Sequence, residues 1–180
     1  ALLPGSRKQE VNFLMPGMVS LVEKFPEYQF VIAGAPNFTK EDYDDYLQGK
    51  QLPIVFSATY DLLKNAHAAV VTSGTATLET ALFNVPQIVV YKGNAVTISI
   101  AKLLIKIGFI SLVNLIVDRE IVKELIQEDC NSANLTKELS RILSGSGRTQ
   151  MLADYAELHE RMGEPGASSK AADLMLSYLK

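Results

Sequence analysis

Two short stretches decide the fold of this chain: Leu2-Leu3-Pro4-Gly5-Ser6-Arg7 and Ser73-Gly74-Thr75-Ala76-Thr77-Leu78-Glu79. Each stretch follows or ends an apolar run and opens a helical pattern. Each is therefore expected to place a turn of small residues and a helix N-terminus at the carboxyl edge of a parallel sheet. Free backbone N–H groups and the helix dipole favour anions at such an edge, so the two stretches predict a phosphate-binding site.

Strand-like and helix-like segments alternate along the first half of the chain. Strands are expected at 28–33, 52–56, 67–72 and 85–91, with helices at 11–25, 39–47, 60–65 and 75–83. Parallel strands need crossover connections, which are usually helices, so the alternation predicts an α/β fold with a Rossmann-like doubly wound parallel sheet. Extra helices are expected at 96–107, 119–127, 135–143, 149–162 and 168–179. We expect a single domain over 1–180, with 149–180 as a C-terminal helical segment.

Composition narrows the classes of function. The 180 residues are 48% hydrophobic and carry a net charge of −3, so no basic surface for nucleic acid is expected. A lone Cys130 and the lack of a signal-peptide pattern point to the cytoplasm. No spacing of His or Cys suits a metal, and we expect no metal and no cofactor. Because Ala1-Leu2-Leu3 has the pattern of a strand end, we expect the chain to be a fragment.

The two turns supply candidate ligands for a nucleoside diphosphate. Backbone N–H groups that would face the diphosphate belong to Gly5, Ser6, Ser73, Gly74 and Thr75. The Arg7 guanidinium would meet phosphate oxygens bidentately, and the Glu79 carboxylate would accept hydrogen bonds from ribose hydroxyls. The alternatives are a solvated Arg7 paired with Glu10, and a capped helix with an acidic residue near its positive end.

Two amides form a third candidate group. Asn114 and Gln127 each offer a donor and an acceptor, which suits the edge of a nucleobase, although both residue types are also common as helix caps or surface residues. The apolar segment 96–117 contains Lys102 and Lys106, which oppose insertion across a bilayer. Core burial, burial between domains and seating on a membrane surface stay open for this segment.

Six segments occur in a characteristic order: Leu3–Arg7 with Glu10, Ser73–Glu79, Pro86–Tyr91 with Lys92, Ser111–Leu115, Arg119-Glu120 and Glu124–Cys130. Together they resemble the lipid-A-disaccharide synthases, bacterial glycosyltransferases of the two-domain GT-B architecture. The resemblance implies transfer of 2,3-diacylglucosamine from UDP-2,3-diacylglucosamine to 2,3-diacylglucosamine 1-phosphate, with release of UDP, in lipid A biosynthesis. It also implies that the chain is the C-terminal, UDP-binding half.

The resemblance further implies roles for single residues. Arg7, Glu79 and Asn114 fall on family positions tied to UDP binding or activity, and Gln127 falls on another recurrent motif position. Arg7 and Glu79 are expected to be catalytic, and Asn114 and Gln127 to bind near the nucleotide or the domain cleft. Val113 departs from the family, in which many members carry Pro before the Asn.

The resemblance places the acceptor site and the general base in the N-terminal domain of the same protein, so the chain alone is expected to bind UDP weakly without catalysing transfer. Homodimerisation and peripheral contact with the inner face of the inner membrane stay open. So do two other functions: another UDP-sugar transferase or epimerase, and a non-catalytic nucleotide-binding or dimerisation module.

Overall fold

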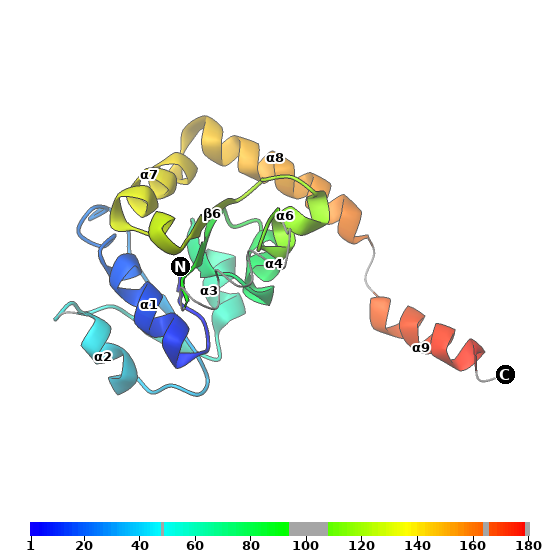
Figure 1. Ribbon diagram of the computed structural model, residues 1–180, viewed down its shortest axis with the longest axis horizontal. Coiled ribbons are helices and arrows are strands. Elements are labelled where there is room, and N and C mark those ends of the chain that lie inside the picture. Colours follow the sequence, from blue (N-terminus) through cyan, green and yellow to red (C-terminus); the bar gives the residue numbers. More distant parts are fainter. Residues whose placement is uncertain (48, 94–107, 164–165, 179–180) are drawn as a thin grey trace.

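The computed structural model describes residues 1–47, 49–93, 108–163 and 166–178 (Figure 1). Within them, six strands form one parallel sheet in the order β3-β2-β1-β4-β5-β6. The strands are β1 (Leu2–Leu3), β2 (Ile32–Gly34), β3 (Ile54–Phe56), β4 (Ala69–Thr72), β5 (Gln87–Tyr91) and β6 (Lys123–Ile126). The predicted Rossmann-like doubly wound sheet is confirmed.

Strand β1 lies at the centre of the sheet. Leu2 pairs with Ile32 of β2 on one side and with Val70 of β4 on the other. The chain first builds the sheet outward through β2 and β3, then returns to the other side of β1 for β4. The strand order therefore reverses between β1 and β4, and in open α/β sheets ligands bind at the carboxyl ends of the strands at this point.

Helices cover both faces of the sheet. They are α1 (Lys8–Val19), α2 (Glu41–Leu47), α3 (Thr59–Asn65), α4 (Thr75–Leu82), α6 (Leu112–Val117), α7 (Ser132–Leu143), α8 (Gly145–Met162) and α9 (Ala167–Ser177), with a short 3-10 helix at Gln127–Asp129. Successive strand residues point to opposite faces. Accordingly, Leu2 and Val70 join the larger core with α1 and α7, whereas Leu3 and Val71 join a smaller core beside α3.

The prediction of a helix at 119–127 is wrong. The structure has strand β6 there, in parallel register with β5 (Ile88 opposite Lys123), followed by the 3-10 helix. Helix α6 ends at Val117 and is followed by Asp118 in a left-handed conformation. Ile121 and Val122 are then buried as the chain enters β6. Pairing with the exposed edge of β5 outweighed a local pattern that also suits a helix. The helix expected at 96–107 lies outside the described residues.

Candidate functional site

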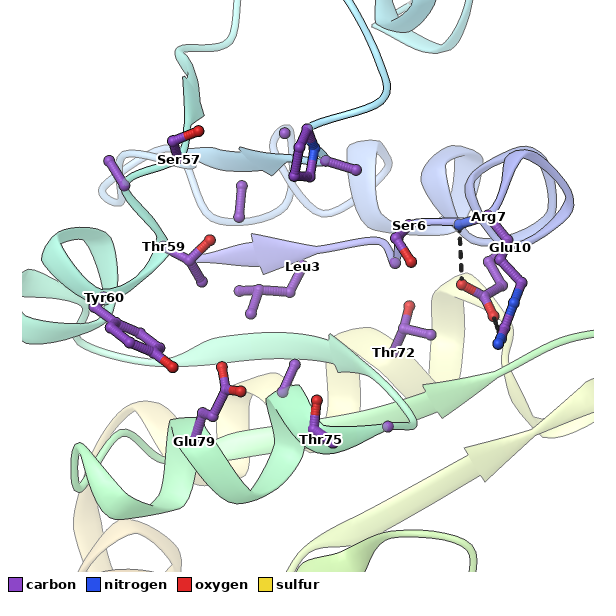
Figure 2. Close-up of a pocket in the computed structure, with 18 of the residues that line it drawn as sticks. Leu3, Ser6, Arg7, Glu10, Ser57, Thr59, Tyr60, Thr72, Thr75 and Glu79 are labelled. Carbon is purple, nitrogen blue, oxygen red and sulfur yellow. Dashed lines mark hydrogen bonds and ion pairs between the residues drawn. The ribbon is translucent and has the colours of Figure 1, made fainter.

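A cavity of about 1030 Å³ opens at the carboxyl ends of β1, β2, β3 and β4, where the strand order reverses (Figure 2). All residues predicted on the two turns line it: Gly5, Ser6, Arg7, Ser73, Gly74, Thr75 and Glu79. These residues lie far apart in the sequence, and the parallel arrangement of β1 and β4 brings them together. The two turns therefore line one hollow at this edge of the sheet.

The first turn connects β1 to α1. Gly5 has a φ of +97°, and a side chain at this position would collide with the Glu10 carboxylate. Glu10 caps the start of α1, since its Oε2 accepts a hydrogen bond from the Arg7 N–H at 3.3 Å. Its Oε1 accepts a second bond from Arg7 Nη1 at 2.7 Å. The Ser6 carbonyl accepts a bond from Asn37 Nδ2 at 3.2 Å, which ties the turn to the loop after β2.

Arg7 thus adopts the alternative arrangement, an arginine paired with Glu10, while also lining the cavity. Its side chain is 82% exposed, so the guanidinium lies at the rim and is open to solvent.

The second turn connects β4 to α4. Gly74 is the N-cap residue of α4 and has no side chain with which to cap the helix. The first N–H groups of a helix lack intrahelical partners. Thr75 and Ala76, at the start of α4, line the cavity, so this helix end offers donors to an anion. The Ser73 hydroxyl is used elsewhere, since its Oγ donates to the Ile110 carbonyl at 2.9 Å.

Glu79 lies one turn further along α4, at the end of the cavity away from Arg7 (Figure 2). Tyr60, from α3, lies at the same end of the cavity, and the Tyr60 hydroxyl points toward the Glu79 carboxylate. Sequence reasoning missed Tyr60 because its closeness to Glu79 arises from tertiary packing. The sequence did contain one signal for Tyr60: it is an aromatic residue shortly after the predicted strand 52–56, which ends at the same sheet edge.

Asn114 lies apart from the residues that line the cavity. Its side chain is fully buried, and Nδ2 donates to the Val122 carbonyl at 2.9 Å and to Glu124 Oε1 at 2.8 Å. Its Oδ1 accepts bonds from the N–H groups of Ile121 and Val122 at 2.8 and 3.0 Å. The amide thus joins α6 to the start of β6.

Gln127 also lies outside the cavity lining, at the end of β6. Its Nε2 donates to the Gly93 carbonyl and its Oε1 accepts from the Gly93 N–H, both at 3.1 Å. This two-bond contact holds the chain just after β5. The structure therefore does not bring the two predicted amides together with the turns, and their predicted contacts with a nucleotide stay predictions.

Three further features bear on the chemistry of the described part of the chain: metal-binding clusters, the cysteine thiol and membrane-spanning helices. No group of three or more His, Cys, Asp or Glu residues there is arranged to hold a metal ion. Burial raises the pKa of the Cys130 thiol, which makes it a poor nucleophile. No helix there has the length and hydropathy needed to span a bilayer. Residues 96–107 of the apolar segment 96–117 lie outside the described residues.

The parallel sheet and the cavity between two turns at its switch point define a Rossmann-like α/β domain. Sequence comparison then narrows the class. The family model for lipid-A-disaccharide synthetase matches residues 1–177, and the chain belongs to this family. The resemblance seen in the six sequence segments is confirmed.

Individual relatives agree with the family match. The chain is 35% identical to the lipid-A-disaccharide synthase of Myxococcus xanthus, 37% to that of Syntrophus aciditrophicus and 38% to that of Gloeothece citriformis. The alignments cover 99%, 100% and 99% of this chain and 49% of each relative. The chain thus spans about half the length of the curated relatives it matches.

Proposed function

We propose that residues 1–180 form the nucleotide-sugar-binding domain of a lipid-A-disaccharide synthase, with 149–180 as its C-terminal helical segment. The reaction is transfer of 2,3-diacylglucosamine from its UDP derivative to 2,3-diacylglucosamine 1-phosphate, with release of UDP. Family membership supports the reaction. The observation that carries the site is the cavity that both turns line.

The diphosphate of UDP binds between the two turns. The first turn, at Gly5 and Ser6, and the start of α4 after Gly74 place backbone N–H groups at one cavity, and the positive end of the α4 dipole lies there too. Arg7 exchanges Glu10 for phosphate oxygens at little cost, because an exposed ion pair contributes only about 0–1 kcal/mol. As the sugar leaves, negative charge builds on UDP, and these donors stabilise it.

The ribose binds beside Glu79. A carboxylate has two oxygens that accept hydrogen bonds, and the paired hydroxyls of a ribose present two donors at matching separation. Glu79 lines the cavity one helical turn beyond Gly74, which leaves the α4 N-terminus to the diphosphate. Arg7 and Glu79 are therefore the residues to which we assign direct roles in binding and catalysis.

Asn114 serves the site by positioning other groups, while Gln127 holds Gly93 after β5. Asn114 donates to Glu124, and the Glu124 carboxylate accepts bonds from the N–H groups of Ile110 and Ser111 at 2.9 and 3.0 Å. The Ile110 carbonyl in turn accepts the Ser73 hydroxyl. A chain of hydrogen bonds thus links Asn114 to the second turn.

The acceptor and the general base belong to the other half of the enzyme, an N-terminal domain of the same protein. Helix α9 is a candidate contact for that half or for a second copy, because Leu174, Met175 and Leu176 are all exposed. We place the enzyme in the cytoplasm, peripheral on the inner face of the inner membrane, where its acylated substrates reside. No step of this proposal uses a metal or a cofactor.

A transfer assay tests whether this chain binds the donor while the other half supplies the general base. The chain is incubated with UDP-2,3-diacylglucosamine and 2,3-diacylglucosamine 1-phosphate in detergent, and disaccharide and free UDP are quantified. Donor binding is measured separately, by displacement of the bound donor with UDP. We expect UDP to displace the donor, and no disaccharide above background in the transfer assay. Robust disaccharide synthesis by the chain alone would refute the assignment of the base to the other half, and donor binding insensitive to UDP would refute the nucleotide site.

A further inference from the structure

An aromatic ring lies open at the Glu79 end of the cavity. Tyr60 is 54% exposed although it lines a concave site, and its ring packs against Phe83 with ring centroids 5.5 Å apart and planes tilted by 43°. Phe83 directly follows α4, the helix that carries Glu79. The contact therefore braces the Tyr60 ring against the same helix while leaving much of the ring uncovered.

The charges along the cavity give a bound nucleotide a direction. The N–H groups of the turns and Arg7 attract phosphate toward one end, whereas the Glu79 carboxylate repels it from the other. Lys64 lines the same region as Tyr60, but Asp61 lies 3.6 Å away and offsets its charge. The Tyr60 end is therefore suited to the uncharged part of a nucleotide, its nucleoside.

We propose that Tyr60 is the nucleobase-binding residue of the site, with the flat face of uracil stacked on its ring. The proposal rests on the proposed function, because it takes a nucleotide as the ligand. Stacking on an aromatic ring suits a planar base, and bracing by Phe83 reduces the loss of side-chain freedom on binding. The hydroxyl points toward Glu79 in Figure 2, so it lies at the edge of the ring and leaves the ring face to the base.

Calorimetric titrations of Tyr60→Ala and Tyr60→Phe with UDP and with inorganic pyrophosphate test the proposal. Removal of the ring is expected to raise the Kd for UDP about tenfold, the scale typical of base stacking. The Kd for pyrophosphate is expected to stay unchanged, because pyrophosphate lacks a base. Tyr60→Phe keeps the ring and is expected to bind UDP within about threefold of the unmodified chain. The matched control is Tyr178→Ala, since Tyr178 is 88% exposed and lies outside the cavity lining.

Each contrary result has a distinct meaning. An unchanged Kd for UDP in Tyr60→Ala overturns the assignment while leaving the proposed function intact. An equal loss for UDP and pyrophosphate shows a general distortion of the cavity and also overturns it. Absence of UDP binding by the unmodified chain overturns the proposed function, and the assignment of Tyr60 with it.

Discussion

Arg7 Nη1 lies 2.7 Å from Glu10 Oε1, although the Arg7 side chain is 82% exposed and that of Glu10 only 14%. The largely buried carboxylate thus holds an exposed guanidinium at the rim of the cavity. Glu10 also accepts the Arg7 N–H, so one side chain both caps α1 and orients the cation. This arrangement presents Arg7 to an incoming anion at the rim of the cavity.

Replacing Arg7 with Ala is expected to weaken binding of both UDP and pyrophosphate, because the lost contact is to phosphate. Hydrogen bonds to charged groups correspond to a roughly ten- to hundredfold change in Kd. Calorimetry measures both constants. Lys8→Ala is the matched control, since Lys8 is an exposed cation at the start of α1 that does not line the cavity. Equal effects of the two substitutions would show that only net charge matters.

Replacing Glu79 with Gln is expected to raise the Kd for UDP about tenfold while leaving that for pyrophosphate unchanged or slightly improved. The amide keeps one acceptor oxygen for the ribose. Because the amide is neutral, it no longer repels phosphate. Glu27→Gln, at an exposed position outside the cavity lining, controls for the change in net charge. Weaker pyrophosphate binding in Glu79→Gln would contradict a role confined to the ribose.

Gly5→Ala is expected to lower the free energy of unfolding by about 2–3 kcal/mol, because the new side chain meets an unfavourable φ of +97° and displaces Glu10. Gly49→Ala isolates the first effect. Gly49 has a φ of +79°, and an added side chain there meets no described atom within 4 Å, so a loss of only about 1 kcal/mol is expected. Urea unfolding followed by circular dichroism compares the two variants. Equal losses would mean that Glu10 moves aside freely.

Asn114→Ala is expected to lower the free energy of unfolding by about 3 kcal/mol. The substitution leaves the buried N–H groups of Ile121 and Val122 without their acceptor, and each such group typically costs about 1–3 kcal/mol. Asn65→Ala removes one exposed bond to the Asp61 carbonyl and is expected to cost less than about 1 kcal/mol. Unchanged stability of Asn114→Ala together with lost UDP binding would instead favour direct contact with the nucleotide.

The sequence predicts the sheet edge and its two turns well, because local signals carry them. An apolar run followed by a turn that contains Gly5 or Gly74 indicates a strand, a turn and a helix start without further information. Pairing of Arg7 with Glu10 was also open to prediction, since residues three apart at a helix start are neighbours.

Features that depend on tertiary packing escaped prediction. Ile121, Val122 and Leu125 have a spacing that suits a buried helix face as well as a strand. In the structure, the segment forms a strand because it pairs with the edge of β5. The hydrogen bonds of the Asn114 amide to the segment Ile121–Glu124 were likewise not predicted, because they depend on where β6 begins. Tyr60 and Glu79 face one another only because α3 and α4 flank the same end of the sheet.

The most direct test of a nucleotide site at this sheet edge is calorimetric titration of the chain with UDP, alongside UMP and ADP. The account predicts weak but measurable binding that is tightest for UDP and falls in both Arg7→Ala and Glu79→Ala. Absence of binding at millimolar UDP, or binding that survives both substitutions unchanged, would contradict it.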